Sequence, residues 1–325
     1  MKYGFISVAA AVPAVKVADT TFNVEETKRL ISDADAQGAE IVCFPELGLT
    51  AYSCQDLFTQ QLLIEEAEQG LISLMNDTRK LDIISIVGLP VQVGGLLLNC
   101  AAVIQHGQLL GIVPKTYLPN YGEFYEKRWF ASAQDLNDIE IYLAGSPVLV
   151  SSRPKVFQTS EGVKFGVEIC EDVWAPIPPS NKLSLAGADI IFNLSASDEL
   201  IGKHHYLCSL LAQQSARTIS GYVYASCGFG ESTQDVVYGG NAMIFENGHQ
   251  LAEGERFSLQ PQLQMAQIDV ERLRSERRKN TTFINAQRHA TAQMVDCCPV
   301  NARDFRLTRD INPHPFIPLP EKMQA

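Results

Sequence analysis

The sequence predicts an α/β protein built as a four-layer α-β-β-α sandwich. Short β-branched runs alternate along the chain with stretches of helical periodicity, a pattern typical of α/β sheet proteins. Most of the expected strands are continuous apolar runs, which indicates sheets covered on both faces. Segments of the first half also have counterparts in the second half. Two half-sheets with helices on one face each can bury their bare faces together; a single doubly wound sheet is the alternative.

The expected elements follow one another along the whole chain. Apolar runs predict strands at 3–9, 40–44, 83–89, 101–105, 109–113, 163–169, 189–194, 222–227, 242–246 and 265–269. Helical periodicity predicts helices at about 24–37, 55–79, 180–187 and 203–219. Between 116 and 160 the pattern weakens into an aromatic and polar stretch that favours a site-forming loop. After residue 270 the strand pattern stops.

An internal pseudo-twofold duplication is predicted from two pairs of segments. One pair is QGAEIVCFPE (37–46) and AGADIIFNLS (186–195), each a helix end, a Gly-Ala turn, a strand and a polar residue. The other pair is NCAAVIQHGQLLG (99–111) and NAMIFENGHQLAE (241–253), each a strand, a glycine turn and a returning strand. The pairs are similarly spaced in the two halves, so each half is expected to form one sheet.

Composition argues against several classes of function. A net charge of −11 with a pI near 5.1 argues against nucleic acid as the main partner. Apolar runs fall short of the roughly 18 residues of a membrane span, and the N-terminus is typical of a strand rather than a signal peptide, so we expect a cytoplasmic protein without a membrane partner. The eight cysteines should then be free thiols. Because the six histidines lack zinc-site spacing, we predict no metal site.

Three reactive residues follow expected strands, where ligands gather in α/β sheets. Glu46 follows EIVCFP, Lys115 follows LLGIVP, and Cys170 follows VKFGVEI. Each alone also fits a structural role, as a solvated charge or a small core side chain. Together they would supply a general base, an electrophilic stabiliser and a nucleophile. Because Glu171 and Asp172 would raise the pKa of the thiol, a reactive Cys170 needs a nearby cation, for which Lys115 is the candidate.

Three segments resemble the carbon-nitrogen hydrolase, or nitrilase, superfamily. They are FPELGLTAYSCQDLF (44–58), PKTYLPNYGEFYEKRWF (114–130) and GVEICEDVW (166–174). That superfamily has an α-β-β-α sandwich and a Glu-Lys-Cys triad. Its P-E strand end and its P-K-x-x-L-P and G-x-x-I-C-x-D-x-x-x-P segments are all matched here. The resemblance implies Glu46 as the general base, Lys115 as the triad lysine and Cys170 as the nucleophile.

In detail these segments, with N-L-S-A-S at 193–197, are most similar to the glutaminase domain of glutamine-dependent NAD synthetases. The resemblance implies a glutaminase domain at 1–270. Residues 271–325, with P-F-I-P at 315–318, would be an arm or linker toward an ATP-dependent synthetase domain. The S-G-G-x-D-S loop of that domain does not occur in this sequence. The chain would therefore correspond to the amidotransferase portion of a longer enzyme.

The same resemblance implies a glutamine site. Its residues would be Tyr121, Ser197 and Lys203, with Tyr52, Phe124, Glu126 and Glu171 close by. Arginine is often found where Lys203 stands, and an ammonium group cannot fork around a carboxylate as guanidinium does. The structural alternatives are that Ser197 caps a helix beginning near 200 and that the aromatic residues of YGEFYEKRWF (121–130) roof the core.

The implied reaction is hydrolysis of L-glutamine without a cofactor, in a homo-oligomer. ATP, Mg²⁺ and deamido-NAD would belong to the synthetase domain, which would receive the ammonia for NAD synthesis. Two other functions remain open from the sequence. One is a free-standing amidase or nitrilase acting on another amide. The other is a catalytically silent oligomerisation module.

Overall fold

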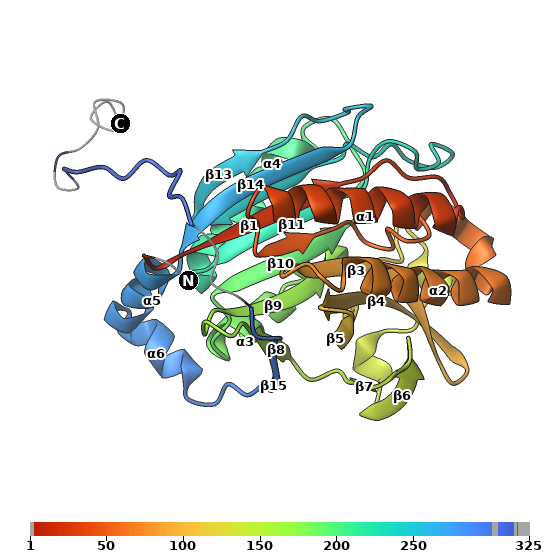
Figure 1. Ribbon diagram of the computed structural model, residues 1–325, viewed down its shortest axis with the longest axis horizontal. Helices are drawn as coiled ribbons and strands as arrows, with labels where there is room; N and C mark the ends of the chain where they lie inside the picture. The colour runs from red at the N-terminus through yellow and green to blue at the C-terminus, as the bar shows by residue number, and fades with distance from the viewer. Residues whose placement is uncertain (1–2, 301–304, 315–316, 318–325) are drawn as a thin grey trace.

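The computed structural model describes residues 3–300, 305–314 and 317, which contain two large mixed β-sheets (Figure 1). In this part of the chain, the first sheet has the order β14-β1-β2-β3-β4-β5, with β1 (Phe5–Val12), β2 (Ile41–Cys43), β3 (Ile84–Val93), β4 (Leu96–Gln105), β5 (Gln108–Pro114) and β14 (Gln262–Asp269). The second has the order β13-β12-β11-β10-β9-β8-β15, with β8 (Lys155–Gln158), β9 (Lys164–Ile169), β10 (Ile190–Ser195), β11 (Gly221–Ser226), β12 (Ala242–Glu246), β13 (His249–Glu253) and β15 (Gln293–Asp296). A separate hairpin pairs β6 (Ile139–Leu143) with β7 (Ser146–Val150).

Helices cover the outer faces of both sheets. Helices α1 (Thr20–Ala36) and α2 (Gln61–Thr78) pack on the first sheet, and α3 (Pro179–Leu185) and α4 (Lys203–Thr218) pack on the second. Helix α1 begins where the Asp19 carboxylate accepts a hydrogen bond from the Phe22 N–H group, and it ends before Gly38, which has a positive φ.

The main core lies between the two sheets. Along β1, Ile6 and Val8 pack into this inner core, whereas Ala9 and Ala11 pack outward against the helices. Because both faces of the strand are buried, the whole of β1 is apolar or small. The four-layer α-β-β-α sandwich predicted from the sequence is thereby confirmed, and the alternative of a single doubly wound sheet is wrong.

The two sheets repeat one topology. The first sheet runs β14-β1-β2-β3-β4-β5, with β14 supplied by the second half of the chain, and the second sheet contains the run β8-β9-β10-β11-β12-β13. The successive pairings in both runs are antiparallel, parallel, parallel, antiparallel and antiparallel. Helices α1 and α3 occupy corresponding connections, as do α2 and α4. The predicted duplication is therefore present in the fold.

Several elements differ from the sequence-based expectation. The helix expected at 55–79 is divided into a 3-10 segment, η1 (Tyr52–Thr59), and α2, with a non-helical backbone at Gln55. The stretch 116–160, expected to lack regular structure, contains β6, β7 and β8. After residue 270 the structure adds α5 (Val270–Lys279), α6 (Thr281–Gln287) and the edge strand β15, so the expectation that strands stop there is wrong.

The C-terminal segment thus begins with elements that pack on the sandwich. In α5, the buried Arg277 guanidinium donates hydrogen bonds to the backbone carbonyls of Ala188, Thr218 and Ile219. The role of 271–325 as a linker stays a prediction, and most of its proline-rich end, including most of P-F-I-P, lies outside the described residues.

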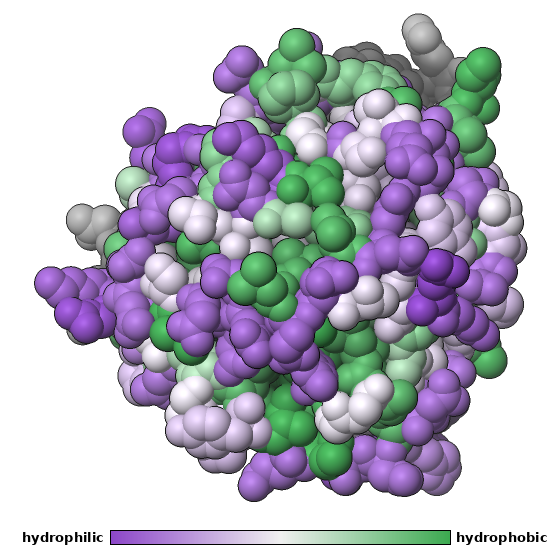
Figure 2. Space-filling view, turned by 90° about the vertical axis from the view of Figure 1, so that its right-hand side faces the viewer, coloured by the Kyte–Doolittle hydropathy of each residue, from purple (hydrophilic) through white to green (hydrophobic). Residues whose placement is uncertain are grey.

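Among the described residues, no helix combines the length and apolar character needed to cross a bilayer. Figure 2 shows the molecule with the right-hand side of Figure 1 turned toward the viewer. Apolar and polar side chains are interspersed on this face.

Candidate active site

Glu46, Lys115 and Cys170 converge from three different strand ends. Glu46 follows β2, Lys115 follows β5, and Cys170 begins the 3-10 turn η4 (Cys170–Val173) directly after β9. The Lys115 Nζ atom lies 2.6 Å from Glu46 Oε1, and both side chains are fully buried. The charges of Glu46 and Lys115 also act on the buried Cys170 thiol. The three side chains therefore share one buried environment.

A second carboxylate completes the surroundings of the Lys115 ammonium group. Glu126, in the 3-10 turn η2 (Glu126–Arg128), places its two oxygens 2.7 and 2.9 Å from Lys115 Nζ. The Tyr52 hydroxyl donates to Glu126 Oε1 at 2.8 Å, and the Asn99 side-chain amide donates to Glu46 Oε1 at 2.6 Å. The ammonium group is thus held between two carboxylates, each of which is fixed by a further hydrogen bond.

The pKa values in this cluster follow from burial and from these charges. Burial alone would lower the pKa of Lys115, but Glu126 and Glu46 outweigh burial and raise it well above its usual value. Burial raises the pKa of Glu126 to about 7, although Lys115 opposes this shift. Burial and Glu46 raise the pKa of Cys170 well above its usual value, and Lys115 lowers it. The resting site therefore holds a protonated thiol beside a charged ammonium group.

The backbone at Cys170 adopts an unusual conformation. Its φ of 46° lies in the left-handed region, which is uncommon for residues other than glycine and tends to occur at functional sites. Its N–H group donates to Asn193 Oδ1 at 3.2 Å, and the Ser195 hydroxyl donates to the same oxygen at 2.7 Å. The chain thus turns sharply at the end of β9, and β10 supports that turn.

The two acids that follow Cys170 have roles that the sequence did not reveal. The Asp172 carboxylate accepts hydrogen bonds from the backbone N–H groups of Thr116 at 3.1 Å, Tyr117 at 2.8 Å and Ile169 at 2.9 Å. Asp172 thereby ties the chain after Lys115 to the turn at Cys170. The acids that chiefly raise the pKa of the thiol are Glu46 and Glu126, rather than the flanking pair expected from the sequence.

The structure also locates the residues implied for a glutamine site. The hydroxyl of the exposed Tyr121 donates a hydrogen bond to Glu171 Oε1 at 2.7 Å. Burial and Glu171 raise the pKa of Tyr121, and the Cys170 thiol also raises it. Lys203 pairs with Asp198.

Lys203 and Ser197 have distinct surroundings. The Lys203 Nζ atom lies 5.5 Å from the ring centre of Trp174 and 6.0 Å from that of Phe124. Ser197 is buried, and its N–H group donates to the Ser226 hydroxyl at 3.1 Å. The alternative in which Ser197 caps a helix is wrong, because α4 follows Gly202 without a side-chain cap.

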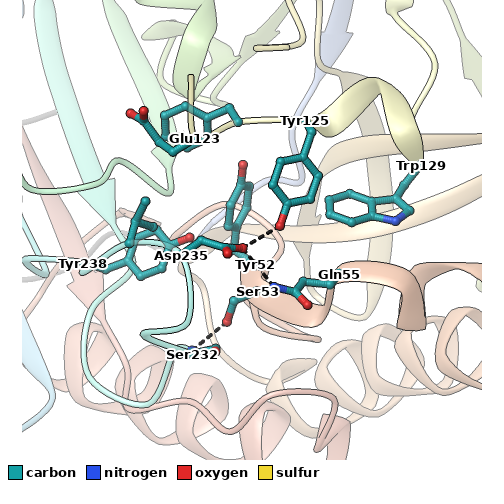
Figure 3. Close-up of a pocket in the computed structure, with 11 residues that line it drawn as sticks. Tyr52, Ser53, Gln55, Glu123, Tyr125, Trp129, Ser232, Asp235 and Tyr238 are labelled. Atoms are coloured by element: carbon teal, nitrogen blue, oxygen red, sulfur yellow. Dashed lines mark hydrogen bonds between the residues drawn. The ribbon is translucent and has the colours of Figure 1, made fainter. Parts of the chain in front are cut away.

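A small pocket opens beside this cluster (Figure 3). Tyr52 and Phe124 line it, together with residues that the sequence analysis did not single out: Ser53, Gln55, Glu123, Tyr125, Trp129, Ser232, Asp235, Val236 and Tyr238. The Tyr125 hydroxyl and the Gln55 amide both donate to Asp235 Oδ2, at 2.5 and 2.9 Å. The pocket is therefore walled by three segments, around residues 52–55, 123–129 and 232–238.

A buried carboxylate joins two of these walls. Glu231 accepts hydrogen bonds from the N–H groups of Tyr52 and Ser53 at 2.8 and 2.9 Å. Glu231 belongs to the segment GFGEST (228–233). The glycines of this segment indicate a turn. Nothing in the neighbouring sequence indicates that Glu231 binds residues 52 and 53, which are far away in the chain.

Replacing Glu126 with glutamine is expected to lower the pKa of Cys170. The Glu126 charge raises that pKa, whereas Lys115, which lowers it, would stay paired with Glu46. The alkylation rate of Cys170 by iodoacetamide, followed by peptide mass spectrometry across pH, should therefore reach half its maximum at a lower pH than in the unmodified chain. Glu123→Gln changes an exposed carboxylate nearby and should leave this midpoint unchanged. A midpoint that moves upward in Glu126→Gln would contradict the assignment.

Comparison with known proteins places this geometry in a family. Residues 7–278 match the family model described as carbon-nitrogen hydrolase. The glutamine-dependent NAD(+) synthetase of Mycobacterium tuberculosis H37Rv is 36% identical over 332 residues, which cover 99% of this chain and 49% of that protein. The synthetase of Aquifex aeolicus is 30% identical, over 70% of this chain and 36% of that protein. The chain thus spans about half the length, or less, of these curated relatives.

Solved structures agree with the sequence matches. A glutamine-dependent NAD(+) synthetase from Cytophaga hutchinsonii superimposes with a TM-score of 0.73 at 27% identity, covering 81% of this chain and 43% of that one. A carbon-nitrogen hydrolase from Helicobacter pylori G27 shares the fold, with a TM-score of 0.70 at 20% identity over 88% of this chain and 96% of that one. This chain belongs to the carbon-nitrogen hydrolase family and is homologous to the glutaminase domain of glutamine-dependent NAD(+) synthetases.

Proposed function

We propose that this chain hydrolyses the side-chain amide of L-glutamine through a thioester on Cys170. The observation that carries the proposal is the buried cluster in which the Lys115 ammonium group lies between Glu46 and Glu126 beside the thiol. The substrate is supported by 36% identity, over nearly the whole chain, to an enzyme named as glutamine-dependent.

The hydrogen bonds of the two carboxylates favour Glu46 as the general base. Glu46 Oε1 accepts from Lys115 and Asn99, whereas its buried Oε2 has no hydrogen-bond partner among the described residues. Glu126 uses both oxygens on Lys115, and one of them also accepts from Tyr52. Only the Glu46 carboxylate therefore keeps a free oxygen for a proton. A base is needed because the pKa of the Cys170 thiol is raised and the resting sulfur is protonated.

The first half of the proposed reaction forms the thioester. Glu46 takes the thiol proton, and the Cys170 sulfur attacks the amide carbon of glutamine. The carbonyl oxygen becomes an oxyanion, which the Lys115 ammonium group and the Glu171 backbone N–H group stabilise. Losing one such donor typically costs about 3 kcal/mol of barrier. The C–N bond then breaks, and the leaving nitrogen takes the proton from Glu46 and departs as ammonia.

The second half releases glutamate. Glu46 takes a proton from water, and the resulting hydroxide attacks the thioester carbon. The C–S bond breaks, and the sulfur recovers its proton from Glu46. The base thus returns to its ionised form after each turnover. In this scheme Glu126 and Tyr52 are positioning residues, because they act through Lys115.

The pocket beside the cluster supports recognition of an amino acid. Glu123 and Asp235 line the pocket and offer negative charge for an α-ammonium group. Lys203 does not line the pocket, but its Nζ atom lies 6.0 Å from the ring centre of Phe124, which does, and it offers positive charge for an α-carboxylate. An ammonium group has three donors, so the pairing of Lys203 with Asp198 leaves donors for a ligand. Tyr121 and Ser197 complete the proposed glutamine site, with Tyr121 anchored by Glu171.

The ammonia is proposed to serve a second domain. The curated relatives are about twice as long as this chain, and they are named as NAD(+) synthetases. We propose an ATP-dependent synthetase domain as the partner, in a cytoplasmic homo-oligomer. That domain would use ATP and Mg²⁺ to activate deamido-NAD for amidation.

Labelling with a glutamine analogue that carries a diazoketone in place of the amide tests this proposal. We expect peptide mass spectrometry to find the label on Cys170, and we expect saturating L-glutamine to suppress the labelling at least tenfold. The same concentration of propionamide serves as the control and should give no protection.

The outcomes separate the competing functions. Label on Cys43 or Cys227 would overturn the assignment of the nucleophile. Label on Cys170 that is suppressed by propionamide but not by glutamine would identify an amidase of different specificity. A chain in which no cysteine reacts would fit a catalytically silent assembly module.

A further inference from the structure

A second cluster of reactive side chains lies on α4 and β13. His204 and Cys208 are four residues apart and so lie on the same face of α4, while Glu253 ends β13. The Cys208 Sγ atom lies 3.5 Å from His204 Nε2, and His204 Nε2 lies 2.9 Å from Glu253 Oε1. All three ligand-type atoms lie within 4.8 Å of one another. The packing of α4 against the β12–β13 hairpin brings them together.

Two of the three spacings are close to those in a tetrahedral metal site, and the third, between the Cys208 sulfur and a Glu253 oxygen, is at most 4.8 Å. With metal bonds of about 2.3 Å to sulfur and about 2.0 Å to nitrogen or oxygen, tetrahedral ligands lie about 3.5 Å apart for S···N and about 3.3 Å for N···O. The observed S···N distance already fits, and the N···O distance needs to open by only a few tenths of an ångström. Glu253 can make this adjustment, because its side chain is 38% exposed.

The chemistry of the three groups selects the kind of metal. Thiolate, imidazole and carboxylate together are ligands for zinc and similar divalent ions, whereas Ca²⁺ and Mg²⁺ require oxygen ligands. With Nε2 bound to a metal, the imidazole proton would be on Nδ1, which is buried and has no hydrogen-bond partner among the described residues. The Gln250 amide donates to Glu253 Oε2 at 2.6 Å, which leaves Oε1 directed toward His204.

We propose that His204, Cys208 and Glu253 bind one divalent transition-metal ion of the zinc class, with water as the fourth ligand. The Cys208 thiol releases its proton to solvent as the metal–sulfur bond forms. The ion would join α4 to the β12–β13 hairpin. The sequence alone gives no sign of this site, because only two of the ligands lie close together in the chain, in an H-x-x-x-C pattern. This inference is independent of the proposed function, because binding requires no turnover.

Cobalt titration of the reduced, chelator-treated chain tests the site. Co²⁺ bound to a thiolate absorbs strongly in the near ultraviolet, so we expect a saturable signal at one equivalent that Zn²⁺ reverses and excess Mg²⁺ does not. Cys208→Ser should lose the signal. His204→Ala and Glu253→Gln should weaken Co²⁺ binding at least tenfold, the order of loss seen even when residues that only support ligands are changed.

Two matched variants serve as controls. His205→Ala removes the neighbouring exposed histidine, and Cys298→Ser removes another partly exposed thiol; both should bind Co²⁺ as the unmodified chain does. A signal that survives in Cys208→Ser, or equal binding by His204→Ala and His205→Ala, would overturn the proposal. Glu253→Gln lies outside the helix, so it tests the site even if a helix variant unfolds. Circular dichroism spectra would identify such a case.

Discussion

Replacing Cys170 with alanine is expected to reduce glutamine hydrolysis to the level of a protein-free control. Removing a nucleophile typically costs roughly five to six powers of ten in kcat. Without the sulfur no thioester can form, and Glu46 has no thiol to deprotonate. Glutamate and ammonia released from L-glutamine, each measured with a coupled assay, give the rate.

Cys227→Ala provides the matched control for this change. Cys227 is another buried thiol near the same charges, since burial raises its pKa and the Glu231 and Glu46 carboxylates raise it further. This variant should keep glutamine hydrolysis within a few-fold of the unmodified chain. If Cys170→Ala stays active, or if Cys227→Ala alone is inactive, Cys170 is not the nucleophile. Urea unfolding curves for both variants exclude loss of folding as the cause.

The architecture could be predicted because its signals are local and repeated. The matched segments at 37–46 and 186–195 contain β2 and β10, which occupy equivalent places in the two sheets. Their apolar runs persist because helices cover one face and the other sheet covers the opposite face. Because these strands are buried on both faces, short apolar segments of the sequence are enough to indicate the four-layer arrangement.

The missed strands lack those signals. In β6, Ile139 and Tyr142 are 40% and 75% exposed, and the buried residues of the hairpin, such as Val150, are too few to form a recognisable apolar run. Strand β15 is short and half-exposed, and it pairs with β8 from far earlier in the chain. Its pairing depends on tertiary contacts rather than on local preference.

The candidate site shows a similar division. Glu46, Lys115 and Cys170 could be predicted because each follows a strand, and strand ends gather ligands. The hydrogen bonds of Glu231 and Asp172 could not be predicted, because both residues bind backbone N–H groups of loops that are distant in the sequence. Asp172 illustrates the point, since in sequence it is a like charge beside a thiol, but in the fold it accepts three backbone hydrogen bonds.

Replacing Lys115 with methionine is expected to abolish glutamine hydrolysis and to destabilise the fold by about 3–5 kcal/mol at pH 8. Breaking a buried ion pair costs this much because it leaves uncompensated charge, and here both Glu46 and Glu126 lose their cation. Urea unfolding measured by circular dichroism gives the loss of stability, and the glutaminase assay gives the loss of activity.

The pH dependence of this loss has a defined sign. Burial already raises the pKa of Glu126 to about 7 in the folded chain, and Lys115 opposes that shift, so removing Lys115 raises this pKa further. When the pKa of a carboxyl group is higher in the folded than in the unfolded chain, the group stabilises the fold most at pH values below its unfolded pKa. This stabilisation is lost as pH rises through the folded pKa. The stability difference between Lys115→Met and the unmodified chain should therefore be smaller at pH 5 than at pH 8. An equal loss at both pH values would contradict the charge explanation.

A double variant separates the two roles of Lys115. Lys115→Met combined with Glu126→Gln removes one of the two unpaired carboxylates, so it should recover part of the lost stability at pH 8. It should not recover glutamine hydrolysis, because the oxyanion still lacks the ammonium group. If the double variant regained both stability and activity, Lys115 would be only a counter-ion to its neighbours. Recovery of stability alone would show that the same positive charge that neutralises two buried acids in the resting state also stabilises the charge that develops on the substrate.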